Sequence, residues 1–344
     1  MFLRHPSKPC SSASSRFGEV STSSSRRVPI ESQKVDAPLT SSATFLVLQI
    51  ADGADAASTA RDAIAGIDDL VKNVGFRDLD AMLSCTVGIG AAAWPRLTAR
   101  RVPAELHPFA PVVGPVHTAP GTPGDLLFHI RANRQDLVFE FERQLLDVLG
   151  DAVTVVDETS GFRYFDVRDL LGFVDGTANP VGNAVAESTL VGAEDGDHVG
   201  GSYVVVQRYL HELGQWQALT TEQQEAVIGR KKADNVELDD AAVGQKSHKT
   251  LATIVVDGVE HDILRDNMPF GSPGSSSFGT YFIGYSRYLW VIEKMLENMF
   301  IGDPPGAYDR LLDFSRATTG STFFAPSADF LSGLADEPMP VQRI

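Results

Sequence analysis

The chain has 344 residues, of which 43% are hydrophobic and 22% are charged, and its formal net charge at pH 7 is −16. This composition excludes disorder throughout the chain and is sufficient for two packed domains. The net negative charge excludes a general binder of nucleic acid or of anionic membranes, because such binding needs clustered lysine and arginine side chains. Small molecules or other proteins are therefore the expected partners.

Cysteine usage and hydropathy narrow the class of protein further. The two cysteines, Cys10 and Cys85, are too few for a disulfide framework, which fits a reducing compartment such as the cytoplasm. Cys85 lies inside an apolar run, where a buried and inert thiol is usual, so we do not expect thiol catalysis. No apolar run approaches the roughly 20 residues that cross a bilayer, and we expect no membrane span.

Residues 1–42 are rich in serine and arginine and contain too few apolar residues to build a core. We interpret them as a disordered tail. The same composition resembles a transit peptide, although a bacterial leader or an early start codon would look no different.

From residue 43 onward the pattern becomes that of a folded domain, which we expect to end near residue 150. Apolar periodicity predicts strands at 45–50, 83–89 and 126–131, and helices at 57–74 and 137–149. Strands and helices in this order are typical of a ferredoxin-like α+β unit.

A second unit with longer loops is expected over residues 151–330. It has predicted strands at 153–156, 203–207 and 280–285, separated by helices and a hairpin. The predicted fold class is therefore α+β, with two ferredoxin-like domains built on antiparallel sheets. Neither unit has a glycine-rich phosphate loop between a strand and a helix, so a nucleotide-binding fold has no support. Residues 331–344 are expected to form a flexible tail.

One helix of the second unit has clear end signals. Thr220 and Gln223 have the spacing of a capping box, and Gly229 marks the exit. Arg230 is thereby fixed at the end of a helix.

The stretch 172–180, Gly-Phe-Val-Asp-Gly-Thr-Ala-Asn-Pro, places one carboxylate in a glycine-rich turn that closes with Asn-Pro. Glycine lets the backbone approach a bulky ligand closely. Asp175 is therefore either a turn cap or a working acid/base, and the motif alone leaves both possibilities open.

Asp257-Gly258, between two apolar runs, predicts a two-residue type I′ hairpin. Counting away from this turn pairs His248 with Asn267 and brings Arg265 beside them, so the three side chains are expected to converge. Taken singly, the histidine could be structural and the arginine could form a solvated ion pair. One imidazole is too few for a zinc site, but it is enough for haem, whose iron is commonly held by one proximal histidine.

These segments resemble the signature segments of dye-decolourising peroxidases, specifically of the bacterial B-type subgroup. The resemblance covers residues 40–330 and includes the stretches at 118–130, 172–180, 227–230, 247–248, 265–271 and 279–285. It implies a protein of two ferredoxin-like domains that binds haem b (iron protoporphyrin IX) in the C-terminal domain.

The resemblance also assigns roles to single residues. It places the proximal iron ligand on His248 and the distal acid on Asp175, with Arg265 and Asn267 beside that acid. A carboxylate can move the proton of peroxide, and a fixed cation can stabilise developing negative charge. Asn267 would orient the peroxide.

Further cofactor contacts follow from the same resemblance. Arg230 matches a residue that pairs with a haem propionate, although a helix-end arginine could equally face solvent. Gly176 and Thr177 are expected to contact the cofactor as part of the Asp175 loop.

Asp309 matches the acid that accepts a hydrogen bond from the proximal imidazole, with Asp303 and Asp313 as nearby rivals. Two residues depart from the family pattern: Ala178 stands where glutamate is common, and Lys249 stands where an apolar residue is usual. The first could alter the hydrogen bonding of Asp175, and the second could reshape the proximal wall.

The expected function is that of a haem peroxidase, which reduces hydrogen peroxide and takes single electrons from dyes, phenolic compounds or Mn²⁺ as the reducing co-substrate. The alternative is a haem-binding protein that handles haem or releases its iron. A third interpretation makes the chain cargo of a protein nanocompartment, docked by its C-terminal tail. We expect a homo-oligomer in the cytoplasm, free or inside such an encapsulating shell.

Overall fold

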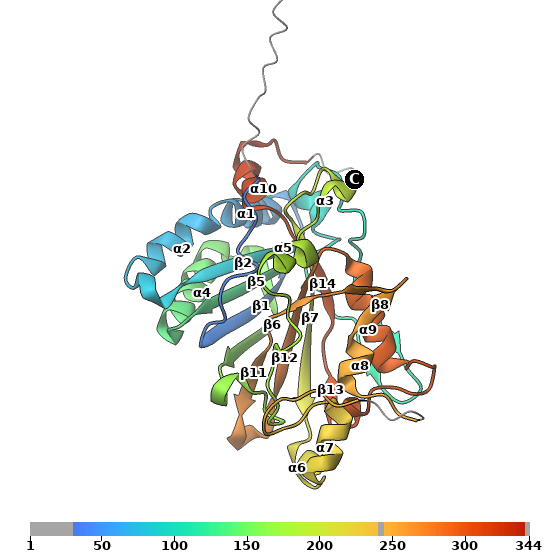
Figure 1. The fold of residues 1–344 in the computed structure, drawn as a ribbon. Helices are drawn as coiled ribbons and strands as arrows, with labels where there is room; N and C mark the ends of the chain where they lie inside the picture. Colours follow the sequence, from blue (N-terminus) through green and yellow to red (C-terminus); the bar gives the residue numbers. More distant parts are fainter. Residues whose placement is uncertain (1–29, 240–243, 341–344) are drawn as a thin grey trace, which may run out of the picture.

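The computed structural model describes residues 30–239 and 244–340 (Figure 1). The strands are β1 (Ser42–Ile50), β2 (Ser84–Ile89), β3 (Val112–Val113), β4 (Thr118–Ala119), β5 (Leu126–Ala132), β6 (Val153–Phe162), β7 (Ser202–His211), β8 (Ile254–Val256), β9 (Val259–His261), β10 (Leu264–Arg265), β11 (Met268–Ser272), β12 (Ser277–Ser286), β13 (Ser315–Ala317) and β14 (Ser321–Ala325). The α-helices are α1 (Ala54–Ala65), α2 (Ile67–Gly75), α3 (Trp94–Leu97), α4 (Gln135–Leu149), α5 (Asn183–Thr189), α6 (Leu213–Gln217), α7 (Thr221–Ile228), α8 (His248–Ala252), α9 (Leu289–Phe300) and α10 (Ala328–Gly333).

The first half of the chain is a ferredoxin-like unit with strand order β6-β1-β5-β2, all pairs antiparallel. Its fourth strand is β6, which we had predicted as the first strand of the second unit. That prediction was wrong because β6 pairs along the whole of β1. The boundary between the halves therefore lies after residue 162 rather than at 150. The single helix predicted at 57–74 is two helices, broken at Gly66.

The second half repeats the same order with β14-β7-β12-β11. Helices α6, α7 and α8 lie in the connection between β7 and β8. Helix α9 lies between β12 and the last two strands, β13 and β14. The predicted α+β architecture of two ferredoxin-like units with antiparallel sheets is confirmed.

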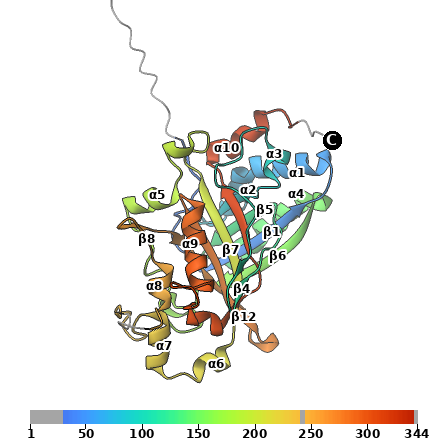
Figure 2. The same cartoon turned by 90° about the vertical axis from the view of Figure 1, so that its right-hand side faces the viewer.

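The two halves join into a closed sheet. β6 pairs with β11 through Gly161 and Phe270, and β2 pairs with β14 through Ile89 and Phe324. Together with the pairing of β12 and β7, these contacts close the sheet into a barrel. Helices α1, α2 and α4 lie outside the first half, and α8 and α9 lie outside the second (Figures 1 and 2).

Alternation along the strands separates the interior of the barrel from its outer face. On β1, Phe45 and Val47 belong to the interior cluster, whereas Leu46 and Leu48 belong to the cluster that packs against the helices. A strand with both faces buried reads as a continuous apolar run, which explains why β1 was recognisable from the sequence.

The capping signals of α7 are confirmed. The Thr220 hydroxyl accepts from the backbone N–H of Gln223, and the Gln223 side chain accepts in return from the Thr220 N–H. The helix ends at Gly229, which has a φ of 89°. A side chain there would be strained and would meet Ser247 Oγ at 2.5 Å, so glycine allows the end of α7 to lie against the start of α8.

Both predicted tails include residues that belong to the folded part of the chain. Residues 30–41 pack against the barrel: buried Gln33 donates to the carbonyls of Val87 and Pro326 at 2.8 Å and accepts from the Val87 N–H at 2.8 Å. At the other end, the guanidinium of buried Arg61 donates to the carbonyl of Leu334. Residues 1–29 and 341–344, the remainder of the two predicted tails, lie outside the described residues.

Across residues 30–239 and 244–340, no helix combines the length and the apolar character that a membrane crossing requires.

We predict that Gln33→Ala lowers the free energy of unfolding by about 2 kcal/mol, because it removes three hydrogen bonds and leaves buried backbone groups without protein partners. Exposed Gln217, the last residue of α6, provides the control Gln217→Ala, which should change the free energy by less than about 0.5 kcal/mol. Urea unfolding of the three proteins measures both values. Equal stabilities for the two variants would contradict the packing role of residues 30–41.

Candidate functional site

A cavity lies between the outer face of β7 and β12 and the helices α8 and α9, which stand beside β7 in Figure 2. Its empty space is about 770 Å³, including the part that opens to solvent. Four predicted site residues line it together: Asp175, His248, Arg265 and Asn267. Cavities of this size that combine apolar walls with a few convergent polar groups are typical ligand sites.

The route by which these residues meet differs from the prediction. The hairpin itself is confirmed, since Val256 pairs with Val259 across a turn in which both Asp257 and Gly258 have positive φ. The ladder ends at Ile254 and His261, however, and does not extend to the site. His248 starts the helix α8, and Arg265 belongs to β10, which pairs with β12.

His248 is oriented by a buried carboxylate. Its Nδ1 lies 2.6 Å from Asp309 Oδ2, and the Asp309 side chain is fully buried. The other carboxylate oxygen accepts the N–H of Leu311 at 2.9 Å, so Asp309 is fixed in place. This leaves Nε2 as the ring nitrogen available for ligation.

The two rival acids are engaged elsewhere. Asp313 accepts from Tyr308 and Arg310 and lies 3.0 Å from the ring of His117. Asp303 pairs with Lys246 at the surface.

The loop that carries Asp175 is fixed to the opposite wall. Asn179 holds the backbone of Arg265 from both sides: its Nδ2 donates to the carbonyl at 2.7 Å, and its Oδ1 accepts from the N–H at 2.9 Å. Within the loop, Gly176 has a φ of 72° and its N–H donates to Asp175 Oδ1 at 2.7 Å. The Asn-Pro that closes the motif therefore joins the loop to β10.

Asp175, Arg265 and Asn267 form an electrostatic group. Burial raises the pKa of Asp175, and the N–H of Gly176 and the nearby Arg265 guanidinium oppose that shift. Burial lowers the pKa of Arg265, which still remains a cation at any ordinary pH. Asn267 Nδ2 lies 3.4 Å from Asp175 Oδ1 as a donor. The arrangement places one proton acceptor beside one cation and one amide.

Two further polar groups line the cavity that the sequence analysis missed. Asp169 accepts the N–H of Phe173 at 2.9 Å, and burial raises its pKa to about 7. His211 lies 2.9 Å from both Thr280 Oγ1 and Ser315 Oγ, and burial lowers its pKa to about 4. No local signal marks His211 or its partners, because they come from three separate strands.

The other residues singled out in the sequence do not line the cavity: Arg230, Gly176, Thr177, Ala178 and Lys249. Arg230 pairs with Glu237 at 3.0 Å, and Lys249 Nζ donates to the same carboxylate at 2.8 Å. Lys249 thus ties α8 to the segment after α7. Thr177 Oγ1 accepts from the Asn235 amide at 2.8 Å. Ala178 is exposed in the same loop.

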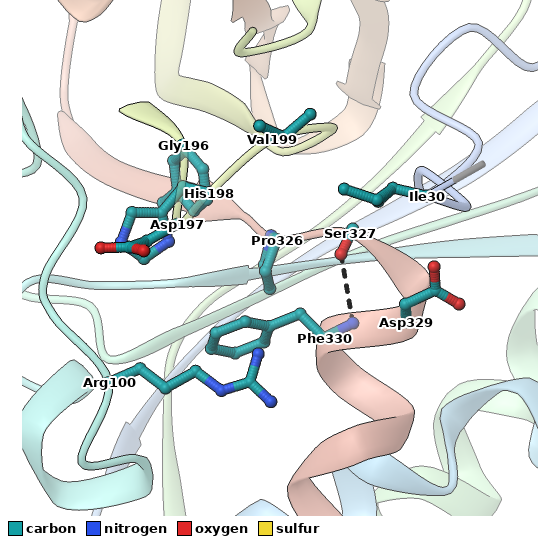
Figure 3. Close-up of a pocket in the computed structure, with 11 residues that line it drawn as sticks. Ile30, Arg100, Gly196, Asp197, His198, Val199, Pro326, Ser327, Asp329 and Phe330 are labelled. Atoms are coloured by element: carbon teal, nitrogen blue, oxygen red, sulfur yellow. Dashed lines mark hydrogen bonds between the residues drawn. The ribbon is translucent and has the colours of Figure 1, made fainter. Parts of the chain in front are cut away.

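A second cavity, of about 500 Å³ including its mouth, lies beside α10 (Figure 3). Arg100 and His198 line it, but the Arg100 guanidinium bonds Glu337 and lies 4.5 Å above the ring of Phe330. The Ser327 hydroxyl accepts the N–H of Phe330 as the cap of α10. The Arg100 and Ser327 contacts stabilise the end of the fold, and none of the predicted site residues lines this cavity.

Within the part of the chain that the structure describes, no group of three or more His, Cys, Asp or Glu side chains is arranged to hold a metal ion.

Comparison with known proteins matches the whole folded region to one family. The family model described as "Dyp-type peroxidase, N-terminal" matches residues 32–163, and that described as "Dyp-type peroxidase, C-terminal" matches residues 166–330. A dye-decolorizing peroxidase of Mycobacterium tuberculosis is 53% identical over 315 residues, which are 91% of this chain and 92% of that protein.

Comparison with solved structures identifies the same family. A variant of DypB from Rhodococcus jostii RHA1 in complex with heme has 58% sequence identity and a TM-score of 0.86, and the match covers 88% of this chain and 98% of that one. Another variant of DypB was solved in complex with manganese, with 59% identity and a TM-score of 0.84 over 86% of this chain and 96% of that one. The encapsulated DyP-type peroxidase from Mycobacterium smegmatis has 51% identity and a TM-score of 0.87 over 91% of this chain and 100% of that one.

The raised pKa of Asp169 predicts a pH dependence of stability. Because its pKa is about 7 in the folded protein and near 4 in an unfolded chain, its proton stabilises the fold below about pH 4, and this contribution is lost as the pH rises through 7. The Asp169→Asn variant lacks this titration. The free energy of unfolding of the wild-type protein relative to this variant should therefore fall between pH 4.5 and 7.5.

Urea unfolding at several pH values measures this difference. The control is Asp151→Asn, which changes an exposed carboxylate and should follow the wild-type curve. Parallel curves for wild type and Asp169→Asn would contradict the assigned pKa.

Proposed function

The chain belongs to the Dyp-type peroxidase family, in the bacterial B-type subgroup, and is a haem-dependent peroxidase, and we propose that His248 holds the haem iron while Asp175, Arg265 and Asn267 act on hydrogen peroxide at the opposite face. The observation that carries this proposal is that all four side chains line one cavity.

The residues of the cavity fit the cofactor. A porphyrin is broad and largely apolar, and apolar side chains, among them Phe282, Met295 and Met299, line this cavity. A single axial ligand is enough for haem iron, and the Asp309 contact leaves Nε2 of His248 for that purpose. When bound, haem supplies the redox chemistry through which peroxide is cleaved and electrons are taken from a donor one at a time.

Asp175 is the proposed proton carrier. Its carboxylate accepts a proton from hydrogen peroxide and returns it to the departing oxygen, which is general acid–base catalysis by one group. Its raised pKa makes it a better base than an ordinary carboxylate and a competent acid once it is protonated.

Arg265 and Asn267 supply charge and orientation. The Arg265 guanidinium lies within 3.5 Å of the Ala252 carbonyl and of Met295 Sδ, so it is directed across the cavity. Held there away from bulk water, it stabilises negative charge that develops on the peroxide oxygens. The Asn267 amide donates beside Asp175 and orients the peroxide for proton transfer.

On the other side of the cavity, the proposed role of Asp309 is electronic as well as structural. The bond from His248 Nδ1 to this buried carboxylate gives the imidazole partial anionic character and makes Nε2 a stronger donor to iron. For the propionates we propose Arg230, with Gly176 and Thr177 as loop contacts. Arg230 would then share its charge between Glu237 and the propionate.

We further propose that dyes, phenolic compounds or Mn²⁺ serve as the reducing co-substrate. The manganese complex of a related DypB variant supports Mn²⁺ among them. We also propose a homo-oligomer in the cytoplasm, and the encapsulated relative from Mycobacterium smegmatis supports a place inside a protein shell. Sustained donor oxidation by peroxide is the expected assay result, and stoichiometric iron release without turnover would instead favour a haem-handling protein.

The ligand assignment predicts unequal roles for the two histidines of the cavity. His248→Ala should lower the haem retained after gel filtration at least about tenfold, because the iron loses its axial ligand. His211→Ala should retain haem, since both nitrogens of that ring are already bonded to hydroxyl groups. The Soret absorbance per protein after reconstitution measures the difference. Haem loss in His211→Ala alone would reverse the assignment.

The role of Asp175 predicts a pH profile. Only the ionised carboxylate accepts a proton, so the rate of reaction with peroxide should fall as the pH drops through the raised pKa of Asp175. This fall should begin at a higher pH than for an ordinary aspartate, whose pKa is about 3.9. Asp175→Asn should lower the rate at pH 7 by about 10² to 10⁴-fold and abolish this dependence.

Stopped-flow mixing of haem-loaded protein with peroxide measures these rates. Asp166 is exposed and lies nine residues before Asp175 on the same connection, so Asp166→Asn is the matched control and should retain the wild-type profile. A wild-type rate in Asp175→Asn would exclude Asp175 as the proton carrier.

A further inference from the structure

Between the two proposed peroxide-handling residues lies a third charged side chain that faces the other way. Arg265 and Asn267 line the cavity on the outside of the barrel, whereas Asp266 is only 3% exposed. Successive side chains of an extended strand point to opposite faces, so Asp266 is directed into the barrel.

The partner of Asp266 comes from the first half of the chain. Arg131 on β5 is fully buried, and its NH1 lies 2.9 Å from Asp266 Oδ2. Its NH2 donates to the Lys34 carbonyl at 2.6 Å and to Thr86 Oγ1 at 3.3 Å. The guanidinium is thus held by the first half and reaches across the interior to the segment that carries Arg265.

A histidine ring lies beside this ion pair. His129 Nε2 lies 3.8 Å from Asp266 Oδ2, and its Nδ1 lies 2.9 Å from the hydroxyl of Tyr285. Burial lowers the pKa of His129, so this ring is neutral, and it stacks on Phe45 at 4.7 Å. Asp266 therefore has one charged partner at hydrogen-bond distance, Arg131, and Arg163 adds a second positive charge without such a bond.

The backbone beside Asp266 needs such support. The strand is interrupted here, since β10 ends at Arg265 and β11 begins at Met268. Two contacts with Ile283 remain at the break: the Asp266 N–H donates to the Ile283 carbonyl at 3.2 Å, and the Ile283 N–H donates to Asn267 Oδ1 at 3.2 Å. Asn179 fixes Arg265 from the cavity side, and the ion pair fixes Asp266 from the interior.

We propose that Arg131 is a positioning residue of the peroxide reaction: by holding Asp266 inside the barrel, it fixes the outward positions of Arg265 and Asn267. This inference rests on the proposed function of those two residues. A buried ion pair adds little net stability over apolar side chains of similar size, so stability alone does not account for its presence. Small displacements of a catalytic group lower rates strongly, which gives a remote anchor its effect.

The test compares Arg131→Met with Arg101→Met in haem-loaded protein. Arg101 also pairs with a carboxylate of the second half, Asp195, but neither residue lines the cavity. Hydrogen exchange of the amides in 264–268 reports the anchoring, and the stopped-flow rate with peroxide per bound haem reports the positioning. Both substitutions are also made in an Arg265→Leu background.

Arg131→Met should speed exchange in 264–268 and lower the rate per haem, each by about tenfold or more. In the Arg265→Leu background, the Arg131→Met substitution should change the remaining rate less than about twofold, because Arg131 acts largely through Arg265. Arg101→Met should leave the local exchange and the rate at wild-type values. If Arg131→Met fails to fold, the isosteric Asp266→Asn, which removes the charge, is measured in its place with the same expectations.

Arg131→Met with a lower Tm but a wild-type rate and local exchange would overturn the inference and leave Arg131 a structural residue. A wild-type rate in Arg265→Leu alone would overturn the proposed function and the positioning role with it. The two failures are therefore distinguishable.

Discussion

The closure of two ferredoxin-like sheets into one barrel is the constraint on which the site depends. Two short pairings, Gly161 with Phe270 and Ile89 with Phe324, join the edges of the halves, and the remaining strands follow in register. A closed sheet has no free edge, and its interior is filled by side chains. The outer face of β7 and β12 is thereby a rigid wall, and the cavity forms where α8 and α9 cover it.

The two walls carry different chemistry for physical reasons. The helical side offers one imidazole, oriented by a buried carboxylate that is itself fixed by a backbone N–H. The sheet side, with the loop fixed to it by Asn179, offers an acid whose pKa is raised by burial next to a guanidinium and an amide. One cofactor between these walls would have a strong donor below and groups for proton transfer above.

Much of this was predictable from the sequence, for identifiable reasons. Continuous apolar runs predicted strands such as β1, and the capping-box spacing of Thr220 and Gln223 predicted the start of α7. The motif at 172–180 and His248 were recognisable because they resemble signature segments of the family, whereas each taken alone left a structural role open.

Features that depend on contacts between residues far apart in the sequence were not predictable. The assignment of β6 to the first half depends on its pairing with β1, which no local pattern records. The hairpin register failed beyond Ile254 because the segment at His248 forms a helix instead of continuing the strand. The sequence analysis did not identify Asp169, His211 or Arg131. Each of these residues acquires its role from partners that the fold brings near.

A crystal structure of the haem-loaded protein tests the central claim most directly. The account predicts iron bound to Nε2 of His248, with Asp175, Arg265 and Asn267 facing the opposite side of the porphyrin. Iron bound to His211, or a porphyrin seated outside the cavity between the sheet and α9, would contradict it.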